Sequence, residues 1–195
     1  MKRVLFIAFG LVIALCMSSC SGSKSASVEI SFNYTRQAGP GSNQYAVWVE
    51  NENNEVVKTL FVTHFSALGR ARNGETPDRG YHYRPSCVHR WVENVKADNL
   101  SDAQLDAFTG ATPSEDGVQT FVWDFTDESG KKVAAGNYRI WIEADLHDWT
   151  IKTFSCPVTA DSNLKPGILD FSEDYSQPDE KYETMITDVK FELKK

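Results

Sequence analysis

A short segment in the middle of the chain places a hydroxyl group among small residues. Residues 106–112 read DAFTGAT, so Thr112 follows Gly110 and Ala111, with Thr109 and Asp106 just upstream. The small side chains leave the Thr112 hydroxyl open to a bulky reagent, which suits an acceptor for a covalently attached group. The alternative is structural. In that case the segment is the end of a helix, and Gly110 is predicted to take the left-handed conformation that often closes a helix.

The segments before this motif are predicted to be helical or irregular. Ser101 and Gln104 have the spacing of a capping box, which predicts a short helix over residues 102–108. Upstream, CVHRWVENVKA has apolar residues at 88, 91, 92 and 95, the spacing of one helix face. Residues 66–86 are rich in Gly, Arg, Pro and Tyr and lack a period, which indicates a long loop. An insertion over about residues 66–117 should therefore position the DAFTGAT motif.

Strands are predicted on both sides of this insertion. Alternating apolar residues indicate strands in VEISFNYT, QYAVWVEN and VVKTLFVTHF before it, and in GVQTFVWDFT, NYRIWIEADL, TIKTFSCPV and TMITDVKFELKK after it. ENNE has the composition of a hairpin turn, and residues 160–180 are predicted to be irregular. This pattern favours a mainly β fold, an immunoglobulin-like β-sandwich over residues 28–195, with the helical and irregular insertion between its third and fourth strands.

The N-terminus has the pattern of an export signal. Lys2 and Arg3 precede the apolar run VLFIAFGLVIALCM, and Cys20 follows two serines. This pattern resembles the lipobox of bacterial lipoproteins, in which the cysteine becomes the acylated first residue. It predicts a signal peptide over residues 1–19, lipidation at Cys20, a flexible tether over residues 20–27, and a lipid-anchored protein that faces the periplasm. Simple secretion with cleavage nearby is the alternative.

Charge and cysteine content narrow the partners. The chain has a net charge of −7, which argues against nucleic acid and against docking to anionic lipid, so membrane contact should come through acyl chains. Besides Cys16 and Cys20 the chain has only Cys87 and Cys156. In an exported protein these two either form a disulfide or remain as buried thiols, and the sequence leaves both possibilities open.

Three segments together resemble a known family. They are AVWVEN with EVVKTLFV, the TGAT of the motif, and FVWDFTDESGKKVAAGNYRIWIEA. They resemble bacterial predicted periplasmic proteins that carry a domain of unknown function. The stretch from Trp123 to Ile140 is also similar to the immunoglobulin-like module of flagellar hook-capping proteins. The resemblance covers about residues 28–158, most of the mature chain.

The resemblance implies a cofactor. Members of this family occur near membrane proteins with PepSY domains and near the enzyme that transfers FMN onto proteins. That transferase recognises Asp-x-x-Ser/Thr-Gly-Ala-Ser/Thr and modifies the final hydroxyl. Asp106, Thr109, Gly110, Ala111 and Thr112 fill every constrained position. The resemblance therefore implies FMN attached through its phosphate to Thr112, with Asp106 helping to position a metal ion or the hydroxyl during transfer.

An attached flavin ring would need an apolar or aromatic surface, and its phosphate would need cations. Tyr81, Tyr83 and Trp91 are aromatic residues near the motif in sequence, and plain packing is the alternative for each. Arg84 and Arg90 are candidates to offset the phosphate or a reduced flavin anion, with solvated charges as the alternative. The scattered histidines predict no metal site, and no phosphate-binding glycine loop occurs.

Two functions follow as alternatives. The first is an extracytoplasmic lipoprotein that carries covalent FMN and exchanges electrons with membrane redox proteins of the PepSY type, as a carrier rather than a turnover enzyme. The second is a cofactor-free immunoglobulin-like module for binding or assembly in the cell envelope.

Overall fold

The computed structural model describes residues 25–38, 43–71, 76–147 and 149–195. The predicted signal peptide over residues 1–19, the lipidation site Cys20 and the tether up to residue 24 lie outside the described residues. Within the described ranges, no helix is both long and apolar enough to cross a membrane.

One sheet has four antiparallel strands. In spatial order they are β5 (Gly117–Trp123), β1 (Ser27–Tyr34), β10 (Ile186–Lys194) and β8 (Gly167–Ile168). The alternation in VEISFNYT is confirmed, because Val28, Ile30, Phe32 and Tyr34 are all buried on one face of β1. The opposite face of this sheet is more exposed, as expected for antiparallel strands with one wet side.

The second sheet has six strands. In spatial order they are β4 (Thr109–Gly110), β3 (Val56–Thr63), β2 (Gln44–Asn51), β6 (Gly136–His147), β7 (Thr150–Ala160) and β9 (Ser172–Ser176). All neighbours are antiparallel except β3 and β4. The predicted hairpin turn after β2 is confirmed. Asn51 donates its backbone N–H to Glu55 O, and Asn54 takes a positive φ of 58°.

The two sheets pack face to face, and the six-stranded sheet is covered on its other side as well. Tyr45, Val47 and Val49 of β2 enter the core between the sheets. Ala46 and Trp48 point the opposite way, into a second apolar cluster beneath the helices. Burial on both faces explains why QYAVWVE is almost continuously apolar in its centre rather than alternating.

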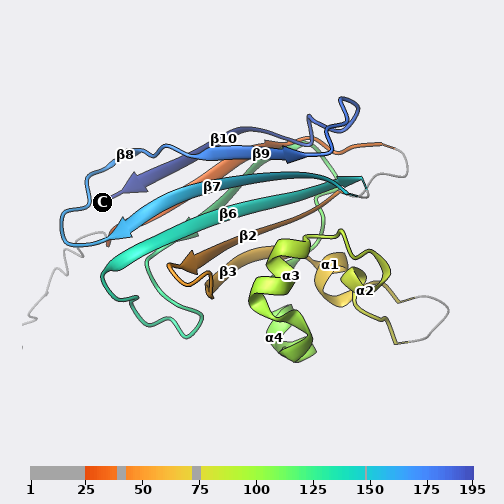
Figure 1. The fold of residues 1–195 in the computed structure, drawn as a ribbon, viewed down its shortest axis with the longest axis horizontal. Helices are drawn as coiled ribbons and strands as arrows, with labels where there is room; N and C mark the ends of the chain where they lie inside the picture. The colour runs from red at the N-terminus through yellow and green to blue at the C-terminus, as the bar shows by residue number, and fades with distance from the viewer. Residues whose placement is uncertain (1–24, 39–42, 72–75, 148) are drawn as a thin grey trace, which may run out of the picture.

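The helices lie between β3 and β5 in sequence and gather at one end of the molecule (Figure 1). They are α1 (His64–Leu68), α2 (Gly80–Tyr83), α3 (His89–Val95), a 3₁₀ turn at Ala97–Asn99, and α4 (Asp102–Asp106). Each is too short to be stable alone, so packing of their apolar residues on the sheet must hold them. Trp91 of α3 and Leu105 of α4 are fully buried in that second cluster.

Residues 66–86 were predicted to be a long loop, but they contain the end of α1 and all of α2. Two further segments also differ from the sequence-based expectation. The strand predicted through VVKTLFVTHF stops at Thr63, and α1 begins at His64. Residues 160–180, predicted to be irregular, contain β8 and β9. The polar strand SEDYS has no apolar alternation, and its conformation depends on edge pairing with β7. The chain is mainly β, with two sheets.

The disulfide considered between Cys87 and Cys156 is not formed, and both residues are buried. Cys156 lies in the core between the sheets, where burial raises the pKa of its thiol to about 12. Cys87 lies with the helices, and its Sγ is 3.2 Å from Ser66 Oγ of α1. The six-stranded sheet therefore separates the two sulfur atoms, and the two cysteines do not pair with each other.

Candidate functional site

The backbone of the motif runs from a helix into a strand. The capping box of α4 is confirmed. The Ser101 hydroxyl accepts from Gln104 N, and Ser101 N donates to Gln104 Oε1 at 3.0 Å. The helix ends at Asp106, its C-cap residue Ala107 is right-handed, and Gly110 is not among the described glycines with positive φ. The expectation that Gly110 caps the helix is therefore wrong, since Gly110 is the second residue of β4.

Gly110 is small because an aromatic ring occupies the space of a side chain. Thr109 and Gly110 pair in parallel with Val62 and Thr63 of β3. A Cβ atom added to Gly110 would lie 2.4 Å from Phe61 Cε2. Phe61 cannot easily move, because its ring stacks on Tyr45 with a centroid distance of 4.9 Å. Glycine thus allows the motif strand to approach β3 closely.

The chain after Thr112 is fastened to the end of β1. Pro113 O accepts hydrogen bonds from the Tyr34 hydroxyl at 3.3 Å and from Arg36 Nη1 at 3.1 Å. Burial raises the pKa of Tyr34, so this hydroxyl stays a donor at neutral pH. Arg36 N also donates to Asp116 Oδ1 at 2.7 Å. Thr112 is therefore held from both sides, by β4 before it and by these bonds after it.

Thr112 itself is partly exposed and lines a cavity of about 670 Å³, which we call the Thr112 cavity. Its volume falls within the roughly 300–1,000 Å³ of small-molecule sites. Ala111 lies beside Thr112 on the lining, and Phe65 contributes an aromatic ring from α1. Thr112 therefore borders a space large enough for a bulky group, and the small Ala111 beside it adds little obstruction.

The lining of the Thr112 cavity is cationic. Arg36, Arg70 and Arg84 lie on it together with His64, and no Asp or Glu is among its described lining residues. Gly69 makes the turn that leads to Arg70, with a φ of 70°, and a Cβ there would lie 1.7 Å from Asp78 O. Three arginines around one hydroxyl, in a chain of net charge −7, form a site suited to an anion.

The other predicted residues lie at varying distances from this cavity. Asp106 is exposed on a neighbouring groove that shares His64 with the Thr112 cavity. Thr109 is partly exposed, and its hydroxyl donates to Asp106 O at 3.4 Å. Tyr83 is 66% exposed on α2, next in sequence to Arg84, and is not on the lining.

The remaining aromatic candidates are packing residues. Trp91 is fully buried, and its Nε1 donates to Thr59 Oγ1 at 3.2 Å, so it has no surface to offer a flavin. Tyr81 is also buried, and its hydroxyl donates to Asp98. Arg90 lies away from the motif, with its guanidinium Cζ 3.7 Å from the centroid of Trp141. For Trp91, the helical spacing of the apolar residues in CVHRWVENVKA reflected the buried face of α3.

Sequence reasoning missed Arg36, Arg70, His64 and Phe65. Residues 66–86 contain four arginines within an acidic chain, and this local excess of cations was an available signal. Arg36 gave no such signal, because it is distant in sequence and reaches Pro113 only through the pairing of β1 with β5.

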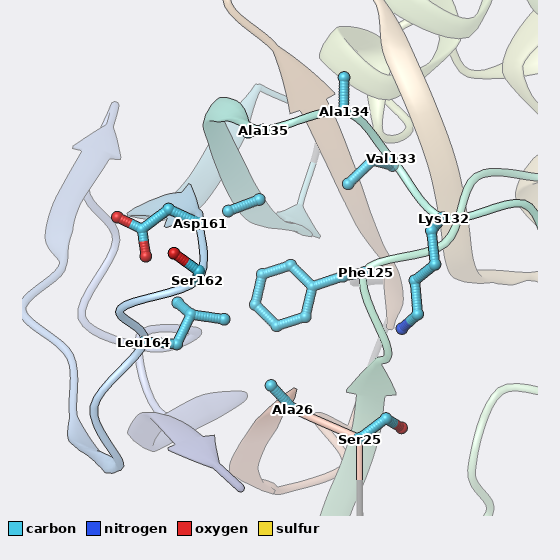
Figure 2. Close-up of a pocket in the computed structure, with 11 residues that line it drawn as sticks. Ser25, Ala26, Phe125, Lys132, Val133, Ala134, Ala135, Asp161, Ser162 and Leu164 are labelled. Atoms are coloured by element: carbon cyan, nitrogen blue, oxygen red, sulfur yellow. The ribbon is translucent and has the colours of Figure 1, made fainter.

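A smaller hollow of about 360 Å³ lies at the opposite end of β1, where the described chain starts (Figure 2). Phe125 lies at its centre, with Ala26 and Leu164 close to the ring. Lys132 is at its edge and donates to the backbone oxygen of Asp124. The lining is mainly apolar and holds none of the motif residues, so this hollow offers no chemistry toward Thr112.

Comparison with known proteins gives one match. The sequence model of the family described as predicted periplasmic protein (DUF2271) matches residues 25–171. This match covers more than half of the chain, and the protein belongs to this family. The description agrees with the periplasmic location that the sequence predicts. No curated protein and no solved structure matches the chain.

Proposed function

We propose that this member of the predicted periplasmic protein family carries FMN covalently on Thr112 and acts as an electron carrier. The observation that supports it most directly is the Thr112 cavity. A partly exposed hydroxyl within a complete DxxTGAT motif lies on a lining with three arginines and no carboxylate. A phosphate ester at this hydroxyl would meet cations, as phosphate groups in proteins usually do.

The residues of the cavity fit FMN by their chemistry. Arg36, Arg70 and Arg84 would balance the phosphate charge, and Phe65 and His64 offer flat rings near it. When bound, the flavin supplies the redox chemistry, and the protein positions it and adjusts its electronics. Cations near an attached flavin stabilise its reduced anionic form, so the same arginines would raise its reduction potential.

Attachment requires a transferase that acts on the exported chain. The bond formed joins Thr112 Oγ1 to the flavin phosphorus, and the bond broken is the pyrophosphate bond of a flavin dinucleotide donor. The other, non-flavin nucleotide leaves as its monophosphate, and the hydroxyl proton goes to a base. Asp106, the first residue of the motif, is exposed, so an enzyme that engages Thr112 can also reach Asp106.

The carrier role rests on location. Lipidation at Cys20 would hold the domain at the membrane and raise its effective concentration near membrane redox proteins, such as the PepSY type. A flexible tether after Cys20 would give the domain the freedom to exchange electrons with more than one partner.

One experiment tests the proposal. The protein is co-expressed with an FMN transferase, and intact mass and in-gel flavin fluorescence are measured for the wild type, Thr112→Ala and Thr109→Ala. We expect an FMN increment in the wild type and in Thr109→Ala, and none in Thr112→Ala. Absence of the increment from the wild type would refute FMN attachment.

The alternative is a cofactor-free immunoglobulin-like module for binding or assembly. The observation that favours it is on β5, an edge strand of the four-stranded sheet. Val118 and Val122 of β5 are 67% and 52% exposed. An edge strand with exposed valines can add a strand from a partner. Replacing both valines with threonine would abolish partner binding under this alternative and leave flavin loading unchanged under the first.

A further inference from the structure

A second large hollow lies between α3 and the outer face of the six-stranded sheet, and none of the motif residues lines it. We call it the α3 cleft, and its volume is about 550 Å³. Its wall is α3, its floor is formed by β6 and β7, and β9 supplies the far edge. The helices lie over the β2 and β3 side of this sheet (Figure 1), and the cleft lies where α3 meets β6, β7 and β9.

The floor of the cleft is held rigidly. Trp141 stacks beside Trp48 with a centroid distance of 6.1 Å and an interplanar angle of 14°. Arg90 lies over the Trp141 ring, with Cζ 3.7 Å from its centroid, and its Nη2 is 3.4 Å from Glu50 Oε2. Because Glu50 is buried, this arginine is neutralised and fixed rather than free to bind an anion.

The rim carries an exposed indole and an oriented histidine. Trp149 is 48% exposed and meets His89 edge to face at 5.8 Å. His89 Nδ1 lies 3.0 Å from Glu143 Oε1, which leaves Nε2 as the ring atom that can face a ligand. Glu143 is fully buried and also accepts the backbone N–H groups of Arg90 and Trp91, at 3.2 and 3.1 Å. The indole and the imidazole are thus positioned before any ligand arrives.

The cations of the cleft are paired with carboxylates, and further carboxylates and hydroxyls lie on the lining. Glu173 pairs with Lys152 at 3.1 Å, as His89 pairs with Glu143. Asp174 and Glu93 add two further carboxylates to the lining. The side chains of four hydroxyl residues also lie on it, namely Thr153, Ser155, Ser172 and Ser176. Such a lining repels anions and offers many hydrogen-bond acceptors.

We infer that the α3 cleft binds an uncharged saccharide, with the sugar's apolar C–H face on Trp149 and its hydroxyls bonded to the lining carboxylates and hydroxyls. A sugar ring has one face of C–H groups and an edge of hydroxyls that both donate and accept. An exposed indole beside acceptors suits both parts of such a ligand. The cavity volume accommodates a small oligosaccharide rather than a polymer cross-section.

The test is isothermal titration of the full protein with named probes. These are cellobiose, maltotriose and N,N′-diacetylchitobiose as neutral sugars, and glucuronate and free FMN as anions. We expect at least one neutral sugar to bind and the two anions not to compete with it. Trp149→Ala should weaken that binding about tenfold or more, a loss on the scale of one aromatic contact.

Matched variants keep the result interpretable. Tyr83→Ala removes an aromatic side chain of similar exposure outside the cleft and should leave sugar binding unchanged. Asp174→Asn should weaken it without removing any packing. Failure of all three neutral sugars to bind would overturn the inference, as would equal affinity in the wild type and Trp149→Ala, or preferential binding of glucuronate or FMN. Flavin loading at Thr112 is measured separately, so either proposal can fail alone.

Discussion

The Thr112 cavity and the α3 cleft use the same insertion and the same sheet, yet they differ in chemistry. The first gathers three arginines around a hydroxyl, and the second neutralises each of its cations with a buried or paired carboxylate. The cavity is built from loops and strand ends, whereas the cleft stands on a helix and strand faces. An insertion that covers only part of one sheet face can therefore create two sites, one that favours anions and one that disfavours them.

Trp91 connects the two regions, and removing it should have the largest effect. Its side chain is fully buried, its ring meets Phe108 edge to face at 6.0 Å, and its backbone N–H bonds Glu143. Trp91→Ala should lower the free energy of unfolding by about 3–5 kcal/mol, measured by urea denaturation. Trp91→Phe should cost less and retain flavin loading. A stable Trp91→Ala variant with unloaded Thr112 would instead indicate a flavin contact.

Gly110 tests the packing of the motif strand. A Cβ at this position would lie 2.4 Å from Phe61, so Gly110→Ala should cost about 1–3 kcal/mol of stability. Gly117→Ala is the control, because a Cβ there meets nothing within 4 Å. Thermal unfolding of both variants checks the expectation. Equal melting temperatures for the two variants would show that Phe61 yields and that the glycine serves another purpose.

Arg70 tests whether the positive charge of the Thr112 cavity matters. Arg70 is exposed and lines the cavity, so Arg70→Gln should leave the fold intact. We expect a lower rate of flavin loading and a lower reduction potential of the loaded protein, because one cation near the flavin is lost. Lys131→Gln, an exposed change on a distant turn, is the control. Sugar binding in the α3 cleft should not change in either variant.

His82 tests the contact between α2 and the 3₁₀ turn at Ala97–Asn99, and replacing it should have the smallest effect. Its Nδ1 is 2.7 Å from Asp78 and its Nε2 is 3.0 Å from Asp98, which joins α2 to the turn before α4. Hydrogen bonds to Asp78 and then Asp98 raise the pKa of His82, while the pKa values of both carboxyls are lowered, chiefly by their bonds to His82.

The signs of these shifts define a pH window. The raised histidine contribution is fully present below about pH 6.5 and is lost as pH rises through the folded pKa. The carboxylate contribution is present above about pH 4 and is lost as pH falls through the folded pKa values. Wild type should therefore exceed His82→Gln in melting temperature near pH 5.5, by a small margin because these groups are exposed, and the margin should shrink at pH 9. A margin that grows with pH would contradict the assignment.

Local patterns were enough to predict the regular parts of this fold. Alternation in VEISFNYT and the Ser101–Gln104 capping box each depend on neighbouring residues, and both are confirmed. The strand SEDYS could not be predicted, because its pairing with β7 comes from tertiary contact. The end of β3 at Thr63 was missed for a similar reason, since His64 and Phe65 continue the strand-like composition.

The candidate site also has a part that could be predicted from the sequence and a part that depends on tertiary contacts. The motif residues are contiguous in sequence, so Thr112 and its neighbours were predictable as a unit. The arginines around it come from three separate segments, and only folding brings Arg36 to the cavity of Arg70 and Arg84. The role of Gly110 was misjudged, because the sequence shows the absence of a side chain but not the Phe61 ring that requires it.

The most direct test of the central claim is tandem mass spectrometry of the peptide that spans residues 97–131, from protein co-expressed with an FMN transferase. The account predicts a phosphate-linked FMN on Thr112, with Thr109 and Ser114 unmodified. An FMN on Thr109, on Ser114 or on another peptide, or the unmodified peptide alone, would contradict it.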